Sequence, residues 1–131
     1  MFFQNLMKMS FGGAGQLNRK TAVDDLHHLP EEEVPDEAKD NPFYEVWLQG
    51  MAKISRIFCD VANHNGIRVW SGSKRGCAQY HVDNVPYRLL VTYAGKGTEW
   101  LSEEASDRGA YDRGEPNEKI IKDHSAKQFN E

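Results

Sequence analysis

The hydrophobic period of this 131-residue chain changes once, and that change limits the fold class more than any other feature. Between residues 42 and 64, apolar side chains recur at spacings of three and four, which indicates an amphipathic helix. Asn41 is a candidate N-cap, and Pro42 suits the first helical position. Gly66 is expected to take the left-handed conformation that ends many helices. The expected buried stripe consists of Phe43, Trp47, Met51, Ile54, Phe58 and Val61.

From Gly66 onward, apolar and polar residues alternate with the period of a β-strand. The strands expected from this pattern are 67–70, 78–83, 87–93 and, after a glycine-containing loop, a return strand at 98–101. We therefore expect an α+β fold. In it, the helix packs through Trp47, Met51 and Phe58 on a small antiparallel sheet formed within residues 67–101.

The segments outside this region are expected to contribute little structure. Residues 1–40 contain a glycine-rich stretch and an acidic run interrupted by proline, so we expect a flexible, partly disordered lead-in. A single domain is expected over residues 41–121, with a polar tail at 122–131.

The charge balance and the cysteine content exclude several classes of partner and compartment. A net charge of −4 and a pI near 5.7 give no electrostatic reason to bind nucleic acid or an anionic membrane. No apolar run approaches the roughly 20 residues of a membrane span. Two cysteines are too few for a disulfide framework, so the reducing cytoplasm is the expected location.

A candidate site lies on the second expected strand. His81 and Asp83 are two residues apart, so on a strand their side chains leave the same face. An imidazole and a carboxylate directed together supply two of the three ligands of the 2-His-1-carboxylate site of non-haem iron proteins. The alternative is a His–Asp hydrogen bond on a solvent-facing strand, and the pattern alone favours that alternative.

Nearby residues add further candidates. Arg88 and Thr92 share a strand face, and a guanidinium there could anchor the carboxylate of an anionic co-substrate. The alternative for Arg88 is a salt bridge to Asp83 or Glu99. Cys77 would complete a zinc set with the candidate pair only if the chain bends, because four residues of strand span about 13 Å. A buried structural cysteine is the simpler interpretation.

The segment from Cys77 to Leu101 resembles the signature of a mostly bacterial family, the domain-of-unknown-function family 1826. Its members carry a Cys shortly before His-x-Asp, followed by Arg-Leu-Leu, Thr-Tyr and Gly-Thr-Glu-Trp-Leu. The matching residues here are Cys77, His81, Asp83, Arg88, Leu89, Leu90, Thr92, Tyr93, Gly97, Thr98, Glu99, Trp100 and Leu101. The resemblance is looser over the wider region from Phe43 to Ile121, where the GEPN-x-x-II piece at 114–121 also fits.

The family resemblance implies a metal chemistry. The family continues with a His-Arg-Ser-Pro element, and its ligand order resembles that of Fe(II)/2-oxoglutarate oxygenases, which are jelly rolls (double-stranded β-helices). It therefore implies Fe(II) or Zn(II) at His81 and Asp83, and a co-substrate such as 2-oxoglutarate at Arg88 and Thr92. Family genes often lie near zinc-homeostasis functions.

The chain departs from the family pattern at its C-terminal side. It reaches Glu131 without the downstream element, and His124 is the only histidine after Asp83. The sequence predicts four or five strands, whereas a jelly roll has about eight. We therefore expect an incomplete barrel with an exposed sheet edge that accepts a second chain.

Three functions stay open at this point. The first is an oxygenase-like enzyme with Fe(II) at His81 and Asp83, in which the third ligand is missing or supplied by His124 and Arg88 binds a carboxylate. The second is a non-catalytic zinc-accessory protein that uses the same ligands. The third is a protein-interaction module in which His81 and Asp83 form only a structural polar pair.

Overall fold

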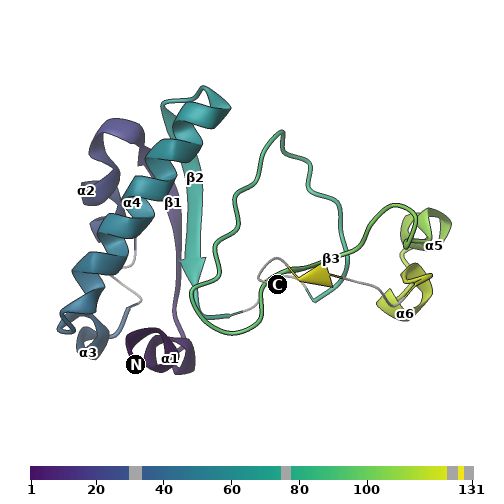
Figure 1. The fold of residues 1–131 in the computed structure, drawn as a ribbon, viewed down its shortest axis with the longest axis horizontal. Helices are drawn as coiled ribbons and strands as arrows, with labels where there is room; N and C mark the ends of the chain where they lie inside the picture. Colours follow the sequence, from purple (N-terminus) through teal and green to yellow (C-terminus); the bar gives the residue numbers. More distant parts are fainter. Residues whose placement is uncertain (30–33, 75–77, 124–126, 129–131) are drawn as a thin grey trace. The chain divides into compact units, whose positions relative to one another are not determined.

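A computed structural model describes residues 1–29, 34–74, 78–123 and 127–128 of the protein (Figure 1). The chain divides into two compact units, Met1–Lys74 and Arg75–Glu131. Helices occur in both units, and each unit contains one two-stranded antiparallel sheet. The α+β class is therefore confirmed. The division differs from the single domain expected over 41–121, because the residues before 41 fold together with the long helix.

The predicted helix is α4, Phe43–Ala62. At its start, the side-chain oxygen of Asn41 accepts a hydrogen bond of 3.0 Å from the N–H of the first helical residue. Pro42 already has helical dihedral angles, φ −57° and ψ −26°. At its end, Asn63 takes the left-handed conformation, with φ 54° and ψ 45°. The prediction for Gly66 was wrong, because asparagine also tolerates this conformation and ends the helix three residues earlier.

The strand predicted at 67–70 lies within β2, Gly66–Gly72. Its partner is β1, Gly12–Asn18, in an antiparallel register that runs from Gly12 opposite Gly72 to Asn18 opposite Gly66. This pairing corrects the expected sheet within 67–101, and it places a strand at 12–18 inside the segment that was expected to be flexible and partly disordered. The hydrogen bonds of a ladder come from the backbone, so the glycine-rich β1 forms without the side-chain pattern that would announce a strand.

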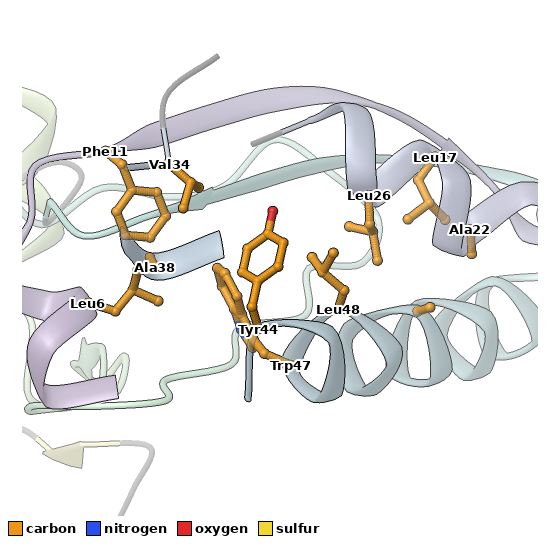
Figure 2. Close-up of a cluster of buried hydrophobic side chains, with 11 residues drawn as sticks. Leu6, Phe11, Leu17, Ala22, Leu26, Val34, Ala38, Tyr44, Trp47 and Leu48 are labelled. Carbon is orange, nitrogen blue, oxygen red and sulfur yellow. The ribbon is translucent and has the colours of Figure 1, made fainter. Parts of the chain in front are cut away.

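The other elements of the first unit also lie in the segment expected to be disordered. They are α1 (Phe2–Lys8), the 3₁₀ turn η1 (Arg19–Thr21), α2 (Ala22–His28) and α3 (Asp36–Lys39). Apolar residues of α1, α2 and α3 join those of β1, α4 and the connecting segments in one core, drawn in Figure 2. Its members are Leu6, Phe11, Leu17, Ala22, Leu26, Val34, Ala38, Tyr44, Trp47, Leu48 and Ala52. Burial of this apolar surface is the main term that stabilises the unit.

The buried face of α4 is rotated by about one residue from the predicted stripe. Trp47 is buried as expected, whereas Met51 and Phe58 are half-buried and Phe43 is 60% exposed. The buried positions of the helix are Tyr44, Trp47, Leu48, Ala52, Ser55 and Cys59. The helix is apolar on more than one side, so its period alone does not choose the face. The small residues on the buried side let neighbouring elements approach closely.

The second unit contains short elements. They are β3 (Glu99–Trp100), α5 (Arg108–Asp112), α6 (Asn117–Ile120) and β4 (Lys127–Gln128). β3 pairs antiparallel with β4, and Ser106 bridges to Ile121. The expected return strand at 98–101 therefore exists in part. Its partner is the tail that was expected to be only polar, and not the segment 87–93.

Two predicted strands, 78–83 and 87–93, are wrong as far as the structure describes the chain. Residues 78–98 carry neither a helix nor a strand and are drawn as a plain loop in Figure 1. Their alternation suits a strand, but a strand also needs a neighbour to complete its backbone hydrogen bonds, and a lone two-stranded hairpin is marginal in water.

Candidate functional site

Asn117 of α6 holds the backbone just before the candidate pair. Its side-chain oxygen accepts a hydrogen bond of 2.9 Å from the N–H of Tyr80, and its side-chain nitrogen donates one of 2.9 Å to the carbonyl of Ala78. The hydroxyl of Tyr111 in α5 accepts a further bond of 3.4 Å from the N–H of Val82. These side chains replace part of the ladder that a neighbouring strand would supply. No local pattern predicted this role for Asn117, which belongs to the GEPN piece at 114–117.

His81 and Asp83 lie together, as the spacing predicted. The Nε2 atom of His81 is 3.4 Å from Oδ1 of Asp83. The side chains are 50% and 34% exposed, so solvent ions can reach both of them. The two polar atoms are close enough to share one ion or one proton.

The second ring nitrogen of His81 fixes how the first can act. Nδ1 lies 3.0 Å from the backbone carbonyl of Gln79, which can only accept a hydrogen bond, so Nδ1 carries a proton. In a neutral imidazole, Nε2 then presents its lone pair to the carboxylate of Asp83. Nε2 of His81 and Oδ1 of Asp83 are then two acceptors that face each other. A second proton or a metal cation between them would stabilise this arrangement. Metal-ligating histidines commonly donate their other ring N–H to a carbonyl in this way.

Arg88 occupies the other oxygen of the carboxylate. Its Nε atom lies 2.8 Å from Oδ2 of Asp83, which is the salt bridge that the sequence analysis gave as the alternative to an anionic co-substrate. This contact orients the carboxylate and also neutralises part of its charge. Thr92, the second residue suggested for a co-substrate, is exposed and makes no hydrogen bond or ion pair among the described residues.

Tyr80 and Glu99 form a second polar pair. The Tyr80 hydroxyl donates a short hydrogen bond to Oε1 of Glu99. Burial, followed by this hydrogen bond and the negative charge of Glu99, raises the pKa of Tyr80 to about 12. Tyr80 therefore stays protonated at neutral pH. Glu99 has Tyr80 as its partner, and Arg88 is paired with Asp83 instead.

The remaining metal-ligand candidates are not assembled in the described part of the chain. No group of three or more His, Cys, Asp or Glu side chains that could hold a metal ion occurs in residues 1–29, 34–74, 78–123 and 127–128. Cys77 and His124, both considered as additional ligands, lie outside the described residues. The described site therefore consists of two candidate ligands, His81 and Asp83, and the guanidinium of Arg88.

The comparisons with known proteins agree with the signature found in the sequence. A family described as Protein of unknown function (DUF1826) matches the chain over residues 3–131. No curated protein and no solved structure matches it significantly. The family assignment covers nearly the whole chain and carries no activity with it.

Proposed function

We propose that this chain, which belongs to the Protein of unknown function (DUF1826) family, binds one divalent metal ion through His81 and Asp83. The observation that carries the proposal is the orientation of the imidazole. Because Nδ1 donates to the Gln79 carbonyl, Nε2 of a neutral imidazole faces Asp83 Oδ1 across 3.4 Å as an acceptor, and a cation between the two atoms would satisfy both.

The donor set limits which metal is expected. Imidazole nitrogen and carboxylate oxygen suit Fe(II) and Zn(II), and neither donor selects strongly between them. The resemblance to Fe(II)/2-oxoglutarate oxygenases extends the proposal to an incomplete jelly roll, in which Arg88 and Thr92 would receive the carboxylate of 2-oxoglutarate. Arg88 would have to leave Asp83 to do so, so metal binding without catalysis is the better supported form.

Metal analysis of the full chain tests this proposal. Wild type, His81→Ala and Asp83→Ala would be loaded with Zn(II) or, without oxygen, with Fe(II), and then dialysed. Each substitution should reduce affinity by more than the roughly 10–100-fold that loss of an outer-shell partner costs. His64→Ala is the matched control, because this histidine is exposed and lies in the first unit.

Arg88→Ala distinguishes a non-catalytic metal-binding protein from an oxygenase-like enzyme. Removing a positive charge that lies 2.8 Å from the carboxylate should tighten metal binding, because Asp83 regains its full charge. In an oxygenase-like protein, the same substitution should also abolish 2-oxoglutarate binding. Equal, substoichiometric metal content in all the variants would contradict the proposal.

An interaction module is the second candidate, and the Arg88–Asp83 ion pair favours it. With this pair in place, a doubly protonated His81 next to Asp83 would complete an ordinary charged cluster without any metal. His81→Ala would then lower stability slightly and leave the metal content unchanged.

The expected cytoplasmic location is part of the same proposal. It rests on the cysteine content and on the sequence composition. Among the helices that the structure describes, none is both long enough and apolar enough to cross a bilayer.

A further inference from the structure

The segment 87–93, with the sequence YRLLVTY, exposes large parts of several apolar side chains. Tyr87 is 61% exposed, and Leu89, Leu90 and Val91 are each 45–46% exposed. Within the described residues, the backbone of 87–92 makes no hydrogen bond to another backbone group. Its composition is that of a strand, rich in aromatic and aliphatic residues, yet among the described residues no strand pairs with 87–92.

An extended chain would sort these residues into two rows. Tyr87, Leu89 and Val91 would lie on one side, and Arg88, Leu90 and Thr92 on the other. Pairing with another strand would satisfy the backbone groups of 87–92 and bring apolar side chains of the two strands into contact along each face.

The order of side chains is close to a palindrome about Leu90. When the segment is placed antiparallel to a copy of itself with Leu90 opposite Leu90, the aliphatic and aromatic residues face residues of their own kind, and the two polar residues face each other. Leu89 then faces Val91, Arg88 faces Thr92, and Tyr87 faces Tyr93. Aromatic–aromatic and aliphatic pairs opposite each other stabilise antiparallel strands.

We infer that residues 87–93 pair antiparallel with the same residues of a second copy of this chain, on a two-fold axis at Leu90. A self-complementary strand gives an isologous contact that closes at two chains, which is the commonest symmetry of soluble oligomers. The charge of Arg88 does not oppose the pairing, because Asp83 of its own chain neutralises it at 2.8 Å. This inference is independent of the proposed metal site.

The size of the contact sets the expected strength. Seven paired residues form a ribbon about 24 Å long, which is a small interface. Because a two-stranded ribbon is itself marginal in water, the dimer should be in equilibrium with the monomer, with a dissociation constant on the order of 100 μM or weaker. Sedimentation velocity of the full chain over a series of concentrations measures this equilibrium.

Two opposite substitutions at Leu90 test the register. Leu90→Lys and Leu90→Glu each place like charges opposite each other on the two-fold axis, so each variant alone should dissociate about a hundredfold more readily or stay monomeric. Mixing the two variants should restore a dimer, because the lysine of one chain then faces the glutamate of the other. Val46→Lys is the control, since Val46 is also exposed, at 63%, but lies on α4; it should dimerise as wild type does.

Three results would overturn the inference. One is a wild-type chain that stays monomeric at concentrations up to about 1 mM. The second is a mixture of the two Leu90 variants that remains monomeric while wild type dimerises. The third is slow hydrogen exchange of the 87–93 amides in the monomer, which would show that the segment is already paired within one chain. Unchanged far-UV circular dichroism confirms that each variant is folded.

Discussion

At the scale of single residues, Asp25 shows how one carboxylate organises the start of α2. Its Oδ2 atom accepts hydrogen bonds from the N–H of Asn18 at 2.7 Å and from the hydroxyl of Thr21 at 2.8 Å. These two donors, Asn18 first, hold the pKa of Asp25 below its ordinary value of 3.8. The carboxylate therefore links the end of β1 to the first turn of the helix.

This lowered pKa predicts a pH dependence with a definite sign. The contribution of Asp25 to stability is fully present above the unfolded-state value of 3.8 and is lost as the pH falls through the lower folded-state pKa. Asp25→Asn should therefore destabilise the protein at neutral pH, and the difference from wild type should vanish in acid. Urea denaturation of both proteins at a series of pH values measures this difference in the free energy of unfolding.

The neighbouring Asp24 provides the control for this experiment. It also lies in the first turn of α2, so Asp24→Asn removes the same favourable interaction with the helix dipole. Asp24→Asn should lose less stability than Asp25→Asn, since no hydrogen bond to Asn18 or Thr21 is involved. Equal losses in the two variants would mean that the dipole, and not the hydrogen bonds, is responsible.

At the scale of secondary-structure elements, two glycines with opposite surroundings predict opposite effects. A Cβ atom added at Gly50 in α4 would meet nothing within 4 Å, whereas one at Gly72 in β2 would lie 2.7 Å from the Trp70 ring and 2.9 Å from the Phe11 carbonyl oxygen. Gly50→Ala should stabilise the protein by about 0.5–1 kcal/mol, because glycine is the poorer helix former. Gly72→Ala should destabilise it by about 1–3 kcal/mol, because backbone atoms must move.

Chemical denaturation of both variants beside wild type measures the two changes. A neutral Gly72→Ala would show that the contact at the end of β2 relaxes without cost. A destabilising Gly50→Ala would show that the open side of α4 is covered in solution.

The elements that the sequence predicted well are those specified by local signals. The α4 helix was located within two residues at each end, because its apolar spacing and the cap at Asn41 involve only neighbouring residues. The β1 strand was missed, because its sequence GGAGQLN has little strand propensity and its partner lies about fifty residues later in the chain. Conversely, the segment 87–93 has the right pattern but lacks a neighbouring strand in the described chain.

The same distinction applies to the candidate site. His81 lies close to Asp83 as expected, although these residues form no strand, so the shared strand face does not explain the contact. Arg88 reaches Asp83 from five residues away, as one of the two alternatives stated. The clamp by Asn117 joins residues nearly forty positions apart, and no local pattern announces it. Pairing over such distances depends on how the whole unit folds, which a single sequence does not reveal.

At the scale of the whole molecule, the apolar core belongs to one unit. All the members of the buried cluster lie in Met1–Lys74. In the described part of the second unit, the buried apolar residues are Ala105, Ala110 and Ile120. Stability should therefore be distributed unequally along the chain.

This distribution predicts how the two units behave as separate fragments. A fragment of residues 1–74 should fold by itself, with the helical circular dichroism of α4 and a cooperative thermal transition. A fragment of residues 75–131 should show no cooperative transition, because three small or medium buried side chains cannot offset its conformational entropy. A disordered 1–74 fragment would show that the first unit depends on the rest of the chain.

The environment of Trp47 has an optical consequence. Phe2, Phe3, Phe11 and Tyr44 surround its indole in edge-on contacts, with ring centroids 6.0–6.4 Å away. A ring held in such asymmetric surroundings produces near-ultraviolet circular dichroism, whereas Trp70, which is 57% exposed, is held less firmly and contributes less. The near-ultraviolet signal therefore reports loss of close packing in the first unit without a label. Loss of its helices changes the far-ultraviolet signal instead, so the two events can be followed separately.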